Sequence, residues 1–174
     1  MSIMARMLKR LVLLLFLITF FAPFAAAQRS QGEFDPAVSG GPFLGGGAFF
    51  NTSRNTSDLA LEMGGMADFR LRERLGLALS AGFMANVSDN DAYSDRTGLY
   101  TAGLRYSFSS EKLSPFVSGG YALGSGEGHT HHFGFAGTGV RYWYGERIGV
   151  QFEVRDYLTS DINFLQGRIT VLLR

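Results

Sequence analysis

The sequence predicts an all-β chain that folds as an eight-stranded antiparallel up-and-down transmembrane β-barrel. Three observations support this fold class: a basic and then apolar leader, about eight segments of alternating pattern after it, and two faces of those segments that differ in kind. One face is rich in Leu, Phe, Tyr, Val and Ala, whereas the other carries Gly, Ser and Thr with scattered Arg, Glu and Asp. Apolar residues facing lipid and polar residues lining a narrow lumen are the arrangement of a membrane barrel.

The leader has the three parts of a secretory signal. Arg6, Lys9 and Arg10 form a basic region, the run from Leu11 to Phe24 is almost wholly apolar, and three alanines precede Gln28. The apolar run is shorter than the roughly 20 residues that a membrane-spanning helix needs, so we expect cleavage after the alanines. The chain is accordingly divided into a signal peptide (1–27), a periplasmic lead-in (28–41) and an outer-membrane β-barrel (42–174).

The composition of the chain after the leader excludes several classes of protein. The full chain has 16 basic and 15 acidic residues, and removing the three basic leader residues leaves 13 against 15, a net charge of −2. This balance gives no support to nucleic-acid binding. The chain has no cysteine, which excludes disulfides and thiol chemistry, and we expect no cofactor.

Four strands are expected in the first half of the barrel, each ended by a polar or charged turn. The glycine-rich segment 42–51 is followed by TSRNTS, and the segment 58–70 is followed by the charged turn LRER. The segment 75–87 alternates most clearly, because Leu, Ala or Phe occupies every second position up to Val87. The segment 97–108 follows the polar run SDNDAYSDR.

The second half repeats this pattern. The expected strands 114–124, 131–144, 148–158 and 163–173 are separated by SGEGHT, GER and TSDI, which are turn-forming compositions. Each of the eight segments is near or above the 9–11 residues that a tilted strand needs to cross a bilayer. An even number of strands places both ends of the barrel on the same side.

The connections between the expected strands indicate which end of the barrel faces the periplasm and which faces the cell exterior. Tight turns at 71–74, 109–113 and 145–147 are assigned to the periplasm, and the polar connections 52–57, 88–96, 125–130 and 159–162 to the cell exterior. Strands that run toward the periplasm end in outward aromatic residues, which is the pattern of an interfacial girdle. These residues are Phe69, Tyr106, Phe108, Tyr142 and Tyr144.

The charges on the inner face are expected to pair, because an isolated charge in a narrow lumen is costly. If Leu158 faces Asn163, then Glu153 lies opposite Arg168, and a turn at 145–147 places Gln151 opposite Arg141. We favour a plug of salt bridges that closes the lumen; the alternative is an ion pathway or gate. The predicted lumen charge cluster is Arg141, Glu153, Arg155 and Arg168, with Glu62, Asp68, Arg70 and Arg105 on the other half.

Three histidines are the candidate metal ligands. His129, His131 and His132 lie in or beside the third outer connection, close to Glu127. Histidines at this spacing with a carboxylate can bind zinc or copper when the geometry allows. The segment has no second ligand cluster, so we interpret it as a solvated loop and assign no metal site.

A nucleophilic enzyme site is the other candidate chemistry. Ser118 and Ser125 lie near the histidines in sequence, and Glu127 or Asp161 is available to orient a base. No histidine follows in the last two expected strands. We therefore predict no catalytic residues.

The last segment resembles the assembly signal of the OmpA/OmpX-type family of small outer-membrane β-barrel domains. It reads Gln166-Gly167-Arg168-Ile169-Thr170-Val171-Leu172-Leu173-Arg174, a polar residue and Gly followed by alternating hydrophobic residues. The resemblance covers about residues 40–174 and implies insertion by the outer-membrane assembly machinery. Family members usually end in an aromatic residue, whereas this chain ends in Arg174. The positions that match the signal are Gly167, Ile169, Val171 and Leu173.

The resemblance also bears on activity. Small barrels that act as lipid A deacylases carry a His-x-Ser pair late in the chain, and the matching region 156–163 has no histidine. We therefore expect a non-enzymatic monomer in the Gram-negative outer membrane, with lipid as its surroundings and a structural, surface-interaction or permeability-related role. The alternatives are a secreted or periplasmic lipocalin-like barrel that binds a small apolar ligand, and a lipid-modifying barrel enzyme.

Overall fold

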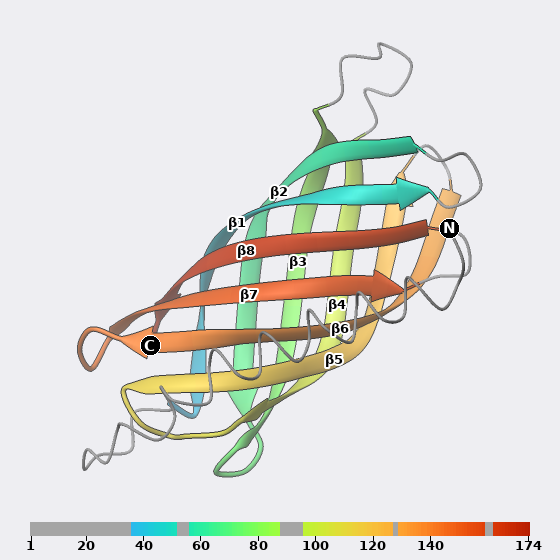
Figure 1. Ribbon diagram of the computed structural model, residues 1–174. Helices are drawn as coiled ribbons and strands as arrows, with labels where there is room; N and C mark the ends of the chain where they lie inside the picture. Colours follow the sequence, from blue (N-terminus) through green and yellow to red (C-terminus); the bar gives the residue numbers. More distant parts are fainter. Residues whose placement is uncertain (1–35, 52–55, 88–95, 127–128, 159–161) are drawn as a thin grey trace. The chain divides into compact units, whose positions relative to one another are not determined.

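The computed structural model describes residues 36–51, 56–87, 96–126, 129–158 and 162–174. Within these residues, eight antiparallel strands form a closed barrel in which β1 also pairs with β8 (Figure 1). The predicted fold class is confirmed. Among the described residues, no helix is long and apolar enough to span a membrane. The strands are β1 (Val38–Asn51), β2 (Thr56–Arg70), β3 (Leu75–Asn86), β4 (Arg96–Ser107), β5 (Leu113–Gly126), β6 (His129–Trp143), β7 (Ile148–Leu158) and β8 (Ile162–Leu173).

The start of β1 differs from the sequence prediction. β1 begins at Val38 rather than at Pro42, and the segment Val38–Gly41 pairs with β2. The barrel therefore includes residues that the sequence assigned to the lead-in. Glycine and proline usually interrupt strands. Here Pro42 is accommodated because the ladder to β8 pairs Gly40 and Phe43 and skips the two residues between them.

The predicted bounds of the outer connection 125–130 are wrong. β5 continues to Gly126 and β6 begins at His129, so that Ser125 pairs with Thr130 and Gly124 pairs with His131. The glycine-rich, polar composition of this segment conceals the strand, because it lacks the alternating apolar residues by which strands are recognised. The β5–β6 hairpin is consequently longer than expected.

Side chains alternate between the two faces of the barrel wall, as the pleat of a strand requires. On β3, Leu79 and Phe83 are exposed whereas Ser80 is buried. On β7, Phe152 is exposed and its neighbour Glu153 is 1% exposed. The outward face is therefore apolar and the inward face holds the charges. This is the reverse of the apolar interior that a lipocalin-like barrel needs, and it disfavours that alternative.

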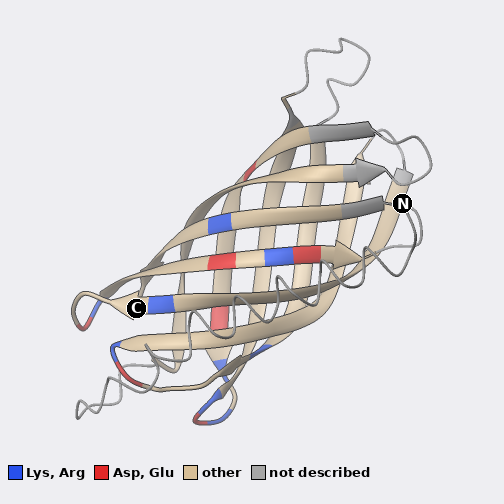
Figure 2. Ribbon diagram, in the orientation of Figure 1, with Lys and Arg blue, Asp and Glu red and all other residues tan. Residues whose placement is uncertain are grey.

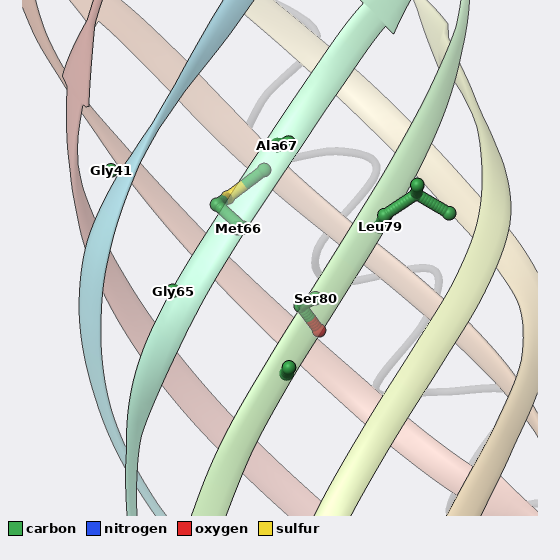
Figure 3. A pocket seen from close by; sticks show the side chains of 7 residues that line it. Gly41, Gly65, Met66, Ala67, Leu79 and Ser80 are labelled. Carbon is green, nitrogen blue, oxygen red and sulfur yellow. The ribbon is translucent and has the colours of Figure 1, made fainter.

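The outward wall has a shallow hollow over β1, β2 and β3 (Figure 3). Small residues at Gly41, Gly65, Ala67 and Ala81 leave the space, and Leu79 stands at its edge. All the lining residues are uncharged. The hollow therefore continues the apolar surface without a polar break.

Aromatic side chains gather outward at the end where β1 begins and β8 ends. Tyr106 and Phe108 form an edge-to-face pair with ring centroids 5.6 Å apart, and Tyr142 and Tyr144 form another at 4.8 Å. Phe69 at the end of β2 is also exposed. Amphipathic aromatic rings favour the headgroup region of a bilayer. These residues thus mark one interface of the barrel, the one predicted to face the periplasm.

Candidate functional site

The lumen is the candidate functional site, because it holds seven of the nine charged side chains that the structure describes on the strands. Figure 2 marks where the charged residues lie along the strands. Every second residue of each strand points inward, and seven of these positions are charged and at most 2% exposed. Arg70, which the sequence grouped with them, is the last residue of β2 and is only half-buried, so it lies at the rim. The seven are Glu62, Asp68, Arg105, Arg141, Glu153, Arg155 and Arg168.

Glu153 is the centre of the first ion-pair group. Arg155 Nε lies 2.9 Å from its Oε1 and Arg168 Nη2 lies 2.8 Å from its Oε2. Ser118 donates a hydrogen bond of 2.7 Å to Oε1. The pairing of Glu153 with Arg168 across β7 and β8 is the register expected from the sequence. One carboxylate is therefore shared between two guanidinium groups from adjacent strands.

Asp68 is the centre of the second group. Arg105 Nε lies 2.9 Å from Asp68 Oδ2, and Arg105 Nη2 donates to Oδ1 at 3.0 Å. Arg141 Nη2 lies 3.0 Å from Oδ2. The Arg141 contact crosses the lumen from β6 to β2 and joins the two halves that the sequence treated separately. Charge-assisted pairs of this kind are among the stronger hydrogen bonds in proteins.

Uncharged polar side chains connect the two groups. Gln151 accepts from Arg141 Nη2 at 2.7 Å and donates to Glu153 Oε2 at 3.3 Å, so that it bridges both centres. Ser80 and Thr101 hydrogen-bond each other at 2.6 Å. They also accept from Arg168 and Arg155, respectively. The pairing of Gln151 with Arg141 is the one expected from the sequence. Ser80 and Thr101 were not predicted, although their polar character at inward positions is the signal that identifies them.

Glu62 has a different environment. It accepts a hydrogen bond from Gln166, which itself accepts from the hydroxyl of Tyr157 at 3.3 Å. Glu62 and Arg168 flank Gly45 on β1, since Gly45 pairs with both of them. Glu62 thus fastens β2 to β8 across a residue that has no side chain.

Inward aromatic rings cover the arginines. Arg168 lies 4.5 Å from the ring centroid of Phe43, and Arg155 lies 4.6 Å from that of Phe135. At the mouth of the barrel, Arg174 stacks over Trp143 at 4.7 Å. Cation–π contacts are strongest where water is excluded, which is the case for the buried Arg155 and Arg168 but not for the exposed Arg174.

Two apolar groups enclose the charged network. One group lies toward the end that carries the outer connections, and consists of Ala60, Leu99, Ala122, Phe135, Tyr157 and Phe164. The other lies toward the end with the tight turns, and consists of Phe43, Met66, Trp143 and Leu172. The charged residues between them are consequently shielded from both mouths.

Inward glycines provide the space for these large side chains. A Cβ atom at Gly76 would lie 2.9 Å from Asp68 Oδ1, and one at Gly82 would lie 2.9 Å from Glu62 Oε1. At Gly149 it would lie 2.7 Å from the indole of Trp143. The sequence indicated small inward residues, and the structure shows that each compensates for a bulky neighbour. An eight-stranded barrel has an interior only wide enough for side chains to fill.

His131 and His132 do not form a common site. His131 and His132 are consecutive on β6 and point to opposite faces of the wall, and His132 hydrogen-bonds the outward Tyr121. Within the part of the chain that the structure describes, no three His, Cys, Asp or Glu side chains could hold a metal ion together. The side chain of His129, and Glu127 and Asp161, lie outside the described residues.

Ser118 lies apart from a histidine base. Ser118 pairs with Gly137, whereas His131 pairs with Gly124, six residues farther along β5. At about 3.3 Å per residue, this separation is roughly 20 Å. Ser118 donates to Glu153 instead. Ser125 is exposed near the end of β5. The serine, histidine and carboxylate combination considered from the sequence is therefore not assembled by the described residues.

Comparison with known protein families identifies the barrel. The model of the outer membrane protein beta-barrel domain matches residues 12–171. The chain belongs to this family. Membership in the outer membrane protein beta-barrel family confirms the resemblance noted in the last strand and implies the outer membrane of a Gram-negative cell. No curated protein matches the chain in sequence.

Solved structures of outer-membrane barrels share the fold. Neisserial surface protein A is 12% identical with a TM-score of 0.65, over 79% of this chain and 97% of that one. Ail, the attachment invasion locus protein of Yersinia pestis, is 10% identical with a TM-score of 0.56, over 80% and 99%. The N-terminal barrel domain of Pseudomonas aeruginosa OprF is 18% identical with a TM-score of 0.54, over 82% and 100%. At such identities the likeness extends to the fold alone.

Proposed function

We propose that this outer-membrane barrel is a non-enzymatic structural protein whose lumen is closed to ions. The observation that carries the proposal is the buried network around Glu153 and Asp68, which extends across the lumen through Arg141 and Gln151. Its charged members and Gln151 are at most 2% exposed, so water reaches almost none of their surface. A path for ions would require these charges to separate.

The cost of separation favours the closed state. Each ion pair is desolvated, and removing a buried charge from its partner costs several kcal/mol. The apolar groups around Phe135 and Trp143 add two further layers that an ion would have to cross. The role supported by this arrangement is that of a rigid structural barrel in the membrane.

The arrangement of the described serines supports a non-enzymatic role. Ser118 is held by Glu153 rather than by a histidine. Among the described side chains, the carboxylates of the lumen are occupied by arginine or glutamine. A lipid-modifying activity is therefore the less favoured candidate.

Biogenesis follows from the outward face of β8. We propose that the signal peptide is cleaved and that the outer-membrane assembly machinery recognises Gly167, Ile169, Val171 and Leu173, with the folded product a monomer. Ile169, Val171 and Leu173 are exposed on the wall. Arg174 instead turns inward over Trp143, so its charge does not interrupt the apolar face.

Single-channel recording tests the closed lumen. The purified, folded protein is expected to give no unitary currents above the bilayer background in planar membranes, because the network fills the cross-section. Heat-modifiable gel migration of the same sample confirms that the protein is folded. Stable unitary currents from a folded sample would contradict the proposal and favour an ion pathway.

A further inference from the structure

The turn between β2 and β3 carries a concentration of positive charge. It contains Arg72, Glu73 and Arg74, and it follows Arg70 at the end of β2. Arg72 and Arg74 are exposed. In Figure 2 basic residues mark the turns at this end of the barrel. We call residues 70–74 the arginine turn.

Backbone hydrogen bonds hold the arginine turn in place. Within it, Leu71 and Arg72 both donate to the carbonyl of Leu75, at 2.8 and 3.0 Å. Arg70 donates to the carbonyl of Ala37 before β1, and Ser107 of β4 donates to the carbonyl of Arg74, both at 2.8 Å. The turn is therefore fixed to both neighbouring strands, and its guanidinium groups project from a defined backbone.

The depth of the arginine turn in the bilayer is set by its neighbours. Leu75, directly after the turn, pairs with Tyr106, whose ring packs edge-to-face on Phe108. Phe69 and Leu71 are also exposed. Aromatic rings lie at the level of the headgroups. Arg72 and Arg74 are consequently at the height of the lipid phosphates.

The lipid-facing wall, unlike the arginine turn, carries almost no charge among its described side chains. Among the outward strand side chains that the structure describes there is no Lys or Arg, and Asp156 is the one charged residue. Long basic side chains near an interface extend their charge to the headgroups. Arginine also binds phosphate with paired hydrogen-bond donors. The placement at the turn thus fits a phosphate ligand supplied by the membrane.

We propose that the arginine turn binds the headgroup phosphates of anionic phospholipids in the periplasmic leaflet. Arg72 and Arg74 supply the charge, and the aromatic residues beside them hold the site at the depth of the phosphates. The inference goes beyond the closed-lumen role and does not depend on it, because the turn lies outside the network.

The test compares spin-labelled phosphatidylglycerol with spin-labelled phosphatidylcholine in phosphatidylcholine vesicles that contain the folded full chain. The fraction of motionally restricted label gives the relative association of each lipid with the protein. We expect about a threefold preference for the anionic label. The double variant Arg72→Gln/Arg74→Gln should reduce this preference toward one, and Arg72→Lys/Arg74→Lys should retain most of it.

Two controls make the result specific. Glu73→Gln removes the negative charge of the same turn and should raise the preference. Salt at 1 M, for which the screening length is about 3 Å, should weaken it. If the double Gln variant does not fold, the single variants are measured. Equal association of both labels with the natural chain, or an unchanged preference after loss of both arginines, would overturn the proposal.

Discussion

Glu153→Gln is expected to lower the free energy of unfolding by about 3–5 kcal/mol. The carboxylate neutralises Arg155 and Arg168, and it accepts from Ser118 as well. The amide that replaces it has no charge and only one acceptor oxygen, so two buried guanidinium groups lose the carboxylate that they share. Loss of a single carboxylate therefore affects three strands at once.

Urea unfolding in lipid vesicles, followed by the folded and unfolded gel bands, measures this change. Glu146→Gln is the matched control, because Glu146 is exposed in the turn 144–147 and its loss should change stability by less than about 0.5 kcal/mol. A Glu153→Gln protein as stable as this control would show that the network is not structural. New channel currents without a loss of stability would contradict the closed-lumen proposal.

Gly139→Ala is expected to destabilise the barrel by about 3 kcal/mol, near the upper end for overpacking. An added Cβ would collide with the carbonyl oxygen of Phe152 and would lie 2.9 Å from the Cα of Glu153. It would also lie 2.7 Å from the ring of Phe116. The backbone atoms belong to β7 and cannot move without weakening the β6–β7 ladder.

Gly134→Ala on the same strand is the control for this variant. Gly134 faces outward, and a Cβ there meets nothing within 4 Å. Alanine is expected to be neutral or to stabilise the strand by about 0.5–1 kcal/mol, since glycine loses more conformational freedom on folding. Both proteins are compared by their urea midpoints in vesicles. Equal urea midpoints would mean that the lumen has space for a Cβ atom at Gly139, and would contradict this prediction.

The sequence pattern was sufficient to predict the strands of the barrel wall and the faces on which their side chains lie. The alternation on β3 and β7 assigned the correct face to Leu79 and Glu153, and loop lengths gave the pairing of Glu153 with Arg168. The predicted strand bounds are wrong where the alternation of apolar and polar residues is weak. Val38–Gly41 and the residues around Ser125 are strands without alternating apolar side chains.

Contacts across the lumen could not be deduced from pairing alone. Asp68 and Arg141 are 73 residues apart, and Glu62 and Gln166 are 104 apart. Whether such side chains meet depends on the stagger of the closed sheet and on how far each extends. The inward aromatic residues were also missed, because small interior residues were expected and the glycines opposite rings such as Phe116 and Trp143 were not considered.

Quenching of the single tryptophan tests the closed lumen most directly. Trp143 is the one tryptophan of the chain, it points inward with no exposed surface, and Arg174 covers it. The reference for exposure is the variant Trp143→Phe/Tyr144→Trp, which moves the indole to a neighbouring outward position. Iodide should quench the folded natural protein in vesicles far less than the urea-unfolded chain or this variant. Quenching of folded Trp143 as strong as in the unfolded chain would show that water and ions enter the lumen, and would contradict the account.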